Sequence, residues 1–290
     1  MTVPSSPHVS AFFDEQTFTV SYLVREPNGK KAVIIDSVLD FDASAGRTST
    51  ESADRILGAV RRESLEVEWI LETHAHADHF SAAPYLKKEL GSPVGIGTHI
   101  TAVQKKFSQI FNLGPDLSTD GTQFDRLLSD DESLKVGELE IQAWHTPGHT
   151  PACMTYVVGD AAFVGDTLFM PDYGTARCDF PGGDAAVMYQ SIRRILDLPE
   201  ETRVFVCHDY GPDGRPFAWE STVAKQRTEN KHVKDGVSQD SFVSMRRERD
   251  ATLAMPALIL PSVQVNIRAG EFPSPEDNGI SYLKIPLNAL

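Results

Sequence analysis

The sequence predicts one domain of mixed α and β structure, with a β-sandwich inside and helices outside. Two observations support this fold class. In each half of the chain, short runs of β-branched and apolar residues come first, and a segment with helical periodicity follows them. No linker rich in Pro, Gly or Ser divides the halves, and 41% hydrophobic residues in a chain of 290 can form one sizeable core.

The first half begins with a predicted hairpin, because two runs rich in β-branched residues flank the turn sequence 27-PNGK-30. The expected elements of this half are strands at 17–24, 32–38 and 68–71 and helices at 51–62, 83–90 and 98–112. The segment 113–135 is rich in Asp, Ser and Gly and lacks the acidic spacing of a calcium loop, so we expect a solvated loop there.

The second half repeats the pattern of strands followed by helices. Its expected elements are strands at 139–145, 152–158, 161–165 and 203–207 and helices at 184–198, 218–228 and 239–250. We therefore expect residues 1–290 to form a single domain, with a C-terminal extension over about 230–290.

The composition excludes several classes of partner. There are 41 acidic and 27 basic residues, a net charge of -14, whereas proteins that bind the phosphate backbone concentrate Lys and Arg. The N-terminus does not resemble a signal peptide, and no apolar run is long enough to span a bilayer. Three cysteines that lie far apart do not suggest a disulfide framework. We therefore expect a cytoplasmic protein that binds neither nucleic acid nor membrane.

Metal-ligand residue types gather where predicted strands end. The stretch 73-THAHADHF-80 directly follows an apolar run, and three further polar residues lie close behind later strands. The full set is His74, His76, Asp78, His79, His149, Asp166 and His208. A lone histidine near a strand end is usually a structural residue with a hydrogen-bond partner. The H-x-H-x-D-H spacing together with three strand-end partners instead favours a metal site at one edge of the sheet.

These residues carry a resemblance to a known family. In order and context, 74-HAHADH-79, 147-PGHT-150, 165-GD-166 and His208 resemble the metallo-β-lactamase superfamily, and Asp36 ends an early strand as that pattern requires. The match covers residues 36–208. It implies an αββα sandwich of the metallo-β-lactamase type with the metal site at one edge, and it leaves the reaction open.

A narrower resemblance extends nearly to the C-terminus. The chain is similar to the persulfide dioxygenase branch in the segments 72-ETHAHADH-79, 147-PGHTPACMTYV-157, Arg177 with 179-DF-180, 207-CHDY-210, 221-STVAKQRTEN-230 and 266-NIRAG-270. This resemblance implies an oxidoreductase that oxidises glutathione persulfide with O2 to sulfite and glutathione. It implies one non-haem Fe(II) per chain with the ligands His74, His149 and Asp166.

Two histidines and one carboxylate on one face of iron leave positions open for substrate and O2. In this interpretation four residues surround the metal without binding it and orient its ligands, namely His76, Asp78, His79 and His208. The sequence departs from the branch pattern in the long segment 112–135 and at Cys178, where we expect a threonine.

The alternative enzyme is a dinuclear zinc thioester hydrolase of the glyoxalase II kind. One zinc would be bound by His74, His76 and His149, the other by Asp78, His79 and His208, and Asp166 would bridge them. All these ligand types are present, but the chain does not resemble the C-terminal helical region of that branch. A third hypothesis is a non-catalytic metal-binding or sulfur-sensing protein, which the open positions disfavour because structural sites tend to be closed.

Binding of glutathione requires local positive charge in an acidic protein. Arg177 follows the Asp166 strand by about ten residues and is the first candidate for a bidentate contact with a carboxylate, with Tyr173 just before it. Arg215, in the loop after His208, is a second candidate. Either arginine could instead form an ordinary surface ion pair.

Overall fold

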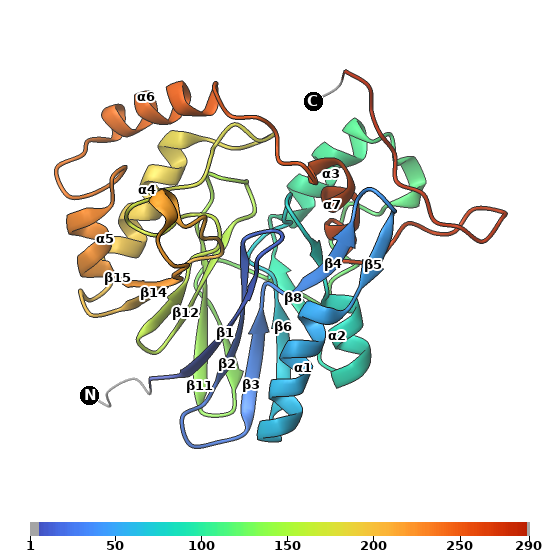
Figure 1. Cartoon of the computed structure of the whole chain (residues 1–290), viewed down its shortest axis with the longest axis horizontal. Helices are drawn as coiled ribbons and strands as arrows, with labels where there is room; N and C mark the ends of the chain where they lie inside the picture. The colour runs from blue at the N-terminus through green and yellow to red at the C-terminus, as the bar shows by residue number, and fades with distance from the viewer. Residues whose placement is uncertain (1–5, 289–290) are drawn as a thin grey trace.

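The computed structural model describes residues 6–288, in which two stacked β-sheets lie between outer layers of helices (Figure 1). In spatial order the first sheet consists of β1 (His8–Asp14), β2 (Thr19–Arg25), β3 (Lys31–Ile35), β6 (Glu66–Leu71), β8 (Val94–Gly97) and β9 (Arg126–Leu128). The second consists of β10 (Glu132–Val136), β11 (Leu139–His145), β12 (Met154–Val158), β13 (Ala161–Phe163), β14 (Arg203–Phe205) and β15 (Glu220–Thr222). A small sheet contains β5 (Arg47–Ser49), β4 (Val38–Asp42) and β7 (Phe80–Ser81).

The helices divide between the two outer faces, as Figure 1 shows. The first sheet is covered by α1 (Glu51–Glu63), α2 (Ala83–Leu90), α3 (Ile100–Ile110) and α7 (Ile259–Asn266). The second is covered by α4 (Ala185–Leu196), α5 (Val223–Glu229) and α6 (Gln239–Asp250). Two short 3₁₀ turns, η1 (Gly114–Asp116) and η2 (Pro212–Gly214), lie in loops. The structure confirms the αββα sandwich that the sequence predicts.

Alternation of side chains along the strands explains why the layers form. In β2, Val20 and Tyr22 point between the two sheets, whereas Leu23 points to the helices outside. In β11, Leu139 and Ile141 are buried between the sheets and the residues that alternate with them are exposed. Successive side chains of a strand point to opposite faces, so each strand contributes to the central core through every second residue.

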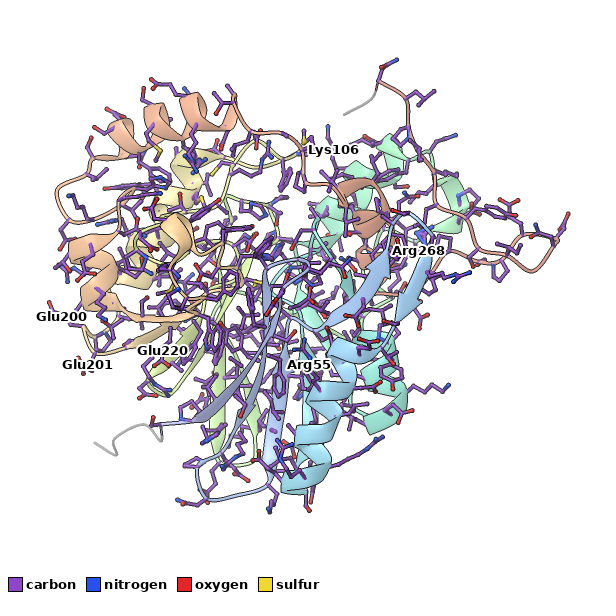
Figure 2. The ribbon with its side chains drawn as sticks, viewed as in Figure 1. Arg55, Lys106, Glu200, Glu201, Glu220 and Arg268 are labelled. Carbon is purple, nitrogen blue, oxygen red and sulfur yellow. The ribbon has the colours of Figure 1, made fainter. Side chains whose placement is uncertain are left out.

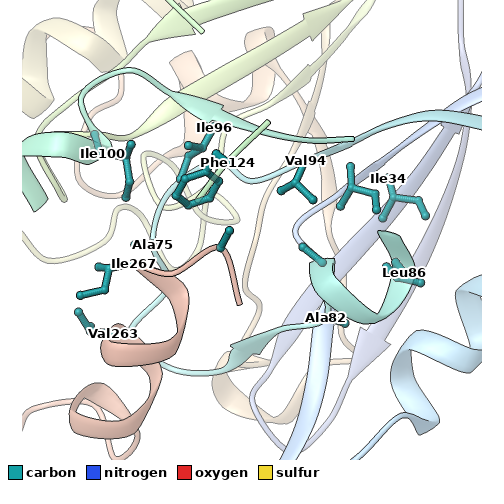
Figure 3. Close-up of a cluster of buried hydrophobic side chains, with 14 of the residues drawn as sticks. Ile34, Ala75, Ala82, Leu86, Val94, Ile96, Ile100, Phe124, Val263 and Ile267 are labelled. Atoms are coloured by element: carbon teal, nitrogen blue, oxygen red, sulfur yellow. The ribbon is translucent and has the colours of Figure 1, made fainter. Parts of the chain in front are cut away.

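Helix α7 closes the outer core of the first sheet. Figure 3 shows Val263 and Ile267 of this C-terminal segment facing Ala75, Ile96 and Ile100, which come from much earlier in the chain. These side chains belong to one cluster of buried apolar residues. Since Ala75 lies inside the H-x-H-x-D-H stretch, α7 packs directly against the segment that carries most of the candidate ligands.

Most of the predicted elements are present, with small differences at their ends. The hairpin at the start is confirmed, because β2 and β3 pair antiparallel with Arg25 opposite Ala32. The helix expected at 218–228 begins only at Val223, because residues 220–222 form β15 on the edge of the second sheet. Thr222 then caps the helix by accepting a hydrogen bond from the backbone N–H of Lys225.

The prediction of a solvated loop over 113–135 is wrong in part. This segment contains η1, all of β9 and the beginning of β10. Strand β9 pairs parallel with β8 at the edge of the first sheet, and Leu128 is completely buried. A three-residue strand flanked by polar residues gives no periodic pattern, so only the tertiary pairing reveals it. Among the described residues no helix is long and apolar enough to cross a membrane.

Candidate metal centre

The candidate ligands meet because the strands that precede them end at one edge of the sandwich. Strand β6 pairs parallel with β3, and β13 pairs parallel with β14, so the carboxyl ends of each pair lie together. Asp36 follows β3, His74 follows β6, Asp166 follows β13 and His208 follows β14. His149 lies in the turn between β11 and β12 at the same edge. The geometry thus brings together residues that lie up to 172 positions apart (36 to 208).

Two glycines allow the ligand loops to pass close to their neighbours. Gly148 has φ +142°, and a Cβ there would lie 2.3 Å from the backbone Cα of Met188 in α4. Gly165 has φ +50°, and a Cβ there would lie 2.7 Å from Oγ1 of Thr73. Only glycine tolerates both the conformation and the contact. This is the physical reason for glycine in the PGHT and GD sequences.

His74, His149 and Asp166 form one compact group of buried ligand atoms, all within 4.8 Å of one another. Oδ2 of Asp166 lies 3.9 Å from Nε2 of His74 and 3.6 Å from Nε2 of His149. The other ring nitrogens are already engaged, since Nδ1 of His149 bonds the carbonyl of Arg177 at 2.8 Å and Nδ1 of His74 bonds Oγ1 of Thr73 at 2.9 Å. Both Nε2 atoms are therefore directed at the carboxylate.

Within residues 6–288, several polar atoms at this edge are buried without a hydrogen-bond partner. They are Nε2 of His74, Nδ1 of His76, Nε2 of His79, Oδ1 of Asp166 and Nε2 of His208. Buried polar atoms are rarely left without partners in folded proteins, and a cluster of such atoms on ligand residues has an explanation when a cation satisfies them. The donor set therefore fits a bound metal ion.

His76 is oriented by two acidic residues. Its Nε2 lies 3.0 Å from Asp36 and 3.3 Å from Glu72, so its Nδ1 is the nitrogen that faces the ligand cluster. Burial by itself would raise the pKa of Asp36, but the imidazole of His76 and hydrogen bonds from Thr73 lower the pKa of this carboxyl below its usual value. Glu72, by contrast, has its pKa raised by burial. Neither acidic residue was predicted to belong to the site, although Glu72 directly precedes the His-rich stretch after an apolar strand.

Asp78, His79 and His208 form the other side of the cluster. Oδ2 of Asp78 lies 3.3 Å from Nε2 of His208 and 3.4 Å from Nδ1 of His79. His208 is also 3.4 Å from Oδ1 of Asp166. The hydroxyl of Thr19 lies within 3.4 Å of all three residues and links them to β2.

The two sides of the cluster differ in proton affinity. Burial and the neighbouring imidazoles of His76 and His149 hold the pKa of His74 well below its usual value, so this ring is neutral and can bind metal. Burial alone would also lower the pKa of His208, but the carboxylates of Asp78 and Asp166 raise it well above the usual value. His208 is thus the better proton carrier of the two.

Asn266, which the sequence analysis quoted only as part of 266-NIRAG-270, fixes the shape of the ligand loop. Its side-chain amide donates hydrogen bonds of 2.8 Å to the backbone carbonyls of both His76 and His79. Its carbonyl oxygen accepts a hydrogen bond of 2.9 Å from the N–H of Ser81. An asparagine 185 residues or more away in the chain thereby ties α7 to the metal-binding loop. No local sequence signal identifies this contact.

A cavity of about 260 Å³ opens onto the cluster. Asp78, His149, Asp166 and His208 line it, together with the aromatic side chains Phe169, Tyr173, Phe180 and Tyr210 and the cations Arg177, Arg246 and Arg249. Lys231 lies 5.3 Å above the ring of Tyr173. The cavity therefore combines metal ligands, an aromatic wall and positive charge, which suits an anionic organic substrate.

The predicted substrate residues lie in different environments. Tyr173 and Arg177 line the cavity, but the guanidinium of Arg177 grips Asp179 with two bonds and donates a third, of 2.6 Å, to the carbonyl of Ala254. Arg215 does not line the cavity. All its donor atoms are engaged by Asp172, Asp209 and the carbonyl of Pro216. These contacts give the Arg215 side chain a structural role, and its contact with substrate stays a prediction.

Cys178 does not face the cavity either. Its Sγ lies 3.0 Å from the sulfur of Met188, in the buried layer between the second sheet and its helices. The three cysteines are all buried and unpaired by disulfides. The residue at which the sequence departs from the branch pattern therefore lies in the packing under α4 and not in the lining of the cavity.

An αββα sandwich with a buried His and Asp cluster at one edge defines a metal-dependent enzyme of the metallo-beta-lactamase type. The chain belongs to the metallo-beta-lactamase superfamily, whose family model matches residues 15–208. It is 57% identical to a probable metallo-hydrolase of Burkholderia pseudomallei, over 97% of this chain and 99% of that protein. It is 51% identical to glyoxylase B2 of Dictyostelium discoideum, over 97% of each chain.

Persulfide dioxygenases are more distant relatives. The chain is 29% identical to the human mitochondrial persulfide dioxygenase ETHE1, over 89% of this chain and 87% of that protein. The crystal structure of ETHE1 from Myxococcus xanthus superposes with a TM-score of 0.72 at 28% identity, covering 91% of this chain and all of that one. These comparisons confirm the resemblance to the branch. The relatives with higher identity carry names that indicate hydrolases.

Proposed function

We propose that this enzyme is a persulfide dioxygenase that oxidises glutathione persulfide with O2, using one Fe(II) per chain. The observation that carries the proposal is the buried group of His74, His149 and Asp166, of which His149 and Asp166 line a cavity with positive and aromatic walls. His74, His149 and Asp166 would hold the iron, which would supply the O2 chemistry for oxidation of a soft sulfur anion. The distant likeness to persulfide dioxygenases supports the same assignment.

The residues around the cluster suit the stoichiometry of this reaction. The outer sulfur of the persulfide gains both atoms of O2 and the oxygen of one water, the S–S bond breaks, and sulfite and the thiol leave. The protons of that water need an acceptor next to the reacting sulfur. Asp78 and Asp166 line the cavity and contact His208, so a carboxylate there can accept a proton beside the imidazole of His208.

Two cations without acidic partners recognise the substrate in this proposal. Arg246 and Arg177 line the cavity but are neutralised by Asp250 and Asp179. Within residues 6–288, neither Arg249 nor Lys231 has a carboxylate within 4.0 Å. Their free donors can bind the carboxylates of glutathione, while Tyr173 and Tyr210 pack against its backbone. Arg249 therefore takes over the role that the sequence suggested for Arg177.

A dinuclear zinc hydrolase is the second candidate. It is favoured by the unpartnered Nε2 atoms of His79 and His208 and by Asp78, whose carboxylate lies near both imidazole rings, as ligands of a second metal would. The names of the relatives at 57% and 51% identity agree with this alternative. Both candidates use the same cavity, and they differ in the number of metal ions and in the need for O2.

Elemental analysis of anaerobically purified protein, combined with an oxygen electrode, separates the two. Our proposal requires about one iron per chain and uptake of one O2 per glutathione persulfide consumed, with sulfite as the product. Two zinc ions per chain, no O2 uptake and hydrolysis of a glutathione thioester would establish the hydrolase instead.

A further inference from the structure

A second cavity, of about 250 Å³, lies between α7, η1 and the C-terminal tail over residues 273–284, which we call the tail cavity. Residues that line it include Asp116, Gln264, Arg268, Glu276, Tyr282 and Lys284. Figure 2 labels Arg268 beside α7 and this tail. None of these residues lines the cavity at the metal centre, and the proposed function does not involve them.

Arg268 is the unusual member of this set. Only 6% of Arg268 is exposed to solvent, and its Nη1 is buried without a hydrogen-bond partner among residues 6–288. No carboxylate of the described chain lies within 4.0 Å of the guanidinium. Asp116 is close enough for its charge to act on Arg268, but burial still lowers the pKa of the guanidinium. Burying an arginine without a partner is costly, so native proteins normally pair it.

The surroundings of Arg268 show what kind of partner fits. Lys284 adds a second positive charge, and its Nζ makes one hydrogen bond, of 2.8 Å, to the carbonyl of Asn112. Asp116 and Glu276 also line this cavity, but both are exposed, so water screens their charges more than that of the buried Arg268. A guanidinium binds planar or tetrahedral oxyanions through parallel hydrogen bonds.

We propose that the tail cavity binds one small oxyanion of the sulfate or phosphate type, with Arg268 as its main contact and Lys284 as the second. The site is separate from the reaction at the metal centre. It lies on the segment that carries Asn266, the residue whose amide fixes the carbonyls of His76 and His79. Binding at Arg268 therefore stabilises the end of α7, and with it the whole fold.

The test is a titration of the metal-loaded, full-length protein with sodium sulfate, with sodium chloride at matched ionic strength as the reference. We expect saturable binding by calorimetry, and a rise in Tm of roughly 2–4 °C at a sulfate concentration about tenfold above Kd. Arg268→Gln should abolish this saturable component, and phosphate should compete with sulfate in the wild-type protein. A sulfate ion bound at the metal would persist in Arg268→Gln, so the two sites are distinguishable.

Arg62→Gln is the matched control, because Arg62 is an exposed arginine on α1, away from the tail cavity, and should bind sulfate as the wild type does. If Arg268→Gln does not fold, Lys284→Gln provides the second test and should weaken sulfate binding several-fold. The proposal is overturned if Arg268→Gln keeps the full response to sulfate, or if Lys284→Gln binds sulfate as tightly as the wild type. Loss of persulfide turnover in any variant does not bear on it.

Discussion

Asn266 is the residue for which the structure makes the most specific prediction. It lies at the end of α7, is 4% exposed, and makes three hydrogen bonds to the segment 76–81. Asn266→Ala removes all three and leaves two buried carbonyls, of His76 and His79, without these donors. We expect the variant to lose stability and also to bind its metal more weakly.

The magnitude follows from the number of hydrogen bonds. Three buried hydrogen bonds at a net value of about 1 kcal/mol each give a loss of roughly 3 kcal/mol in the free energy of unfolding. Residues that orient metal ligands typically change metal affinity by about 10- to 100-fold when they are replaced. Since Asn266 fixes the backbone on both sides of Asp78, we expect a loss of affinity of this order.

Gln264 is a matched control on the same helix. It is 1% exposed and also makes three hydrogen bonds, of 2.7 to 2.9 Å, but to Leu260 and to both backbone groups of Lys284. Gln264→Ala should therefore lose a similar amount of stability without a change in metal affinity. Urea unfolding measures the loss of stability, and competition with a chelator in the absence of urea measures the metal affinity.

Two results would refute the reasoning about Asn266. One is a metal affinity in Asn266→Ala equal to that of the wild type, which would mean that the loop keeps its shape without α7. The other is an equal loss of affinity in Gln264→Ala, which would mean that any weakening of α7 is sufficient.

Three further predictions concern the site and its surroundings. His149→Ala and Asp166→Ala should lose their iron, whereas His208→Ala should keep most of it and turn over slowly; equal loss of metal in His208→Ala would contradict the assignment of one iron. Arg249→Gln should raise KM for glutathione persulfide about tenfold, as expected for one lost charge-assisted contact, with unchanged iron content and kcat. The exposed Arg247→Gln is its control, and an unchanged KM in Arg249→Gln would remove Arg249 from the site. Burial lowers the pKa of His232 to about 3, below that of the unfolded chain, so its contribution to stability is complete above about pH 6.5 and is lost as the pH falls towards 3. Between pH 7 and pH 5 the free energy of unfolding should fall by roughly 1–2 kcal/mol on this account. The midpoint of urea unfolding should therefore decline less with falling pH in His232→Gln than in the wild type. Parallel plots of midpoint against pH for the two proteins would contradict this prediction.

The fold was predictable from the sequence because its periodic signals are strong. Strands such as β2 and β11 alternate between the central core and the outside, and α1 and α4 carry apolar stripes. Apart from α7, the elements that were not predicted are short or lie on edges, such as β7 with two residues and β9 with three. Their pairing partners come from distant parts of the chain, so no local pattern specifies them.

The residues of the candidate site likewise divide into those that the sequence revealed and those that only the structure reveals. Its histidines and Asp166 were recognisable because ligand residue types follow apolar strands at a spacing that solvated loops rarely have. Asn266 and Glu72 were not singled out, because an amide in an apolar helix and an acid after a strand have many ordinary explanations. Their importance comes from contacts made across the fold, such as the bonds from Asn266 to His76 and His79. The ionic partners of Arg215 are likewise visible only in three dimensions.

The distribution of charge around the cavity explains how an acidic protein can bind an anion. With a net charge of -14, the long-range field repels any anion, and an arginine paired with a carboxylate does not reverse that field. Arg177 and Arg246 are paired in this way. Local attraction for an anion can therefore come from Arg249, which lines the cavity without a carboxylate partner among residues 6–288, and from Lys231 beside Tyr173. If the proposed function is right, these cations bind the thiol carrier and the ligand cluster acts on the sulfur, so the two steps depend on separate residues.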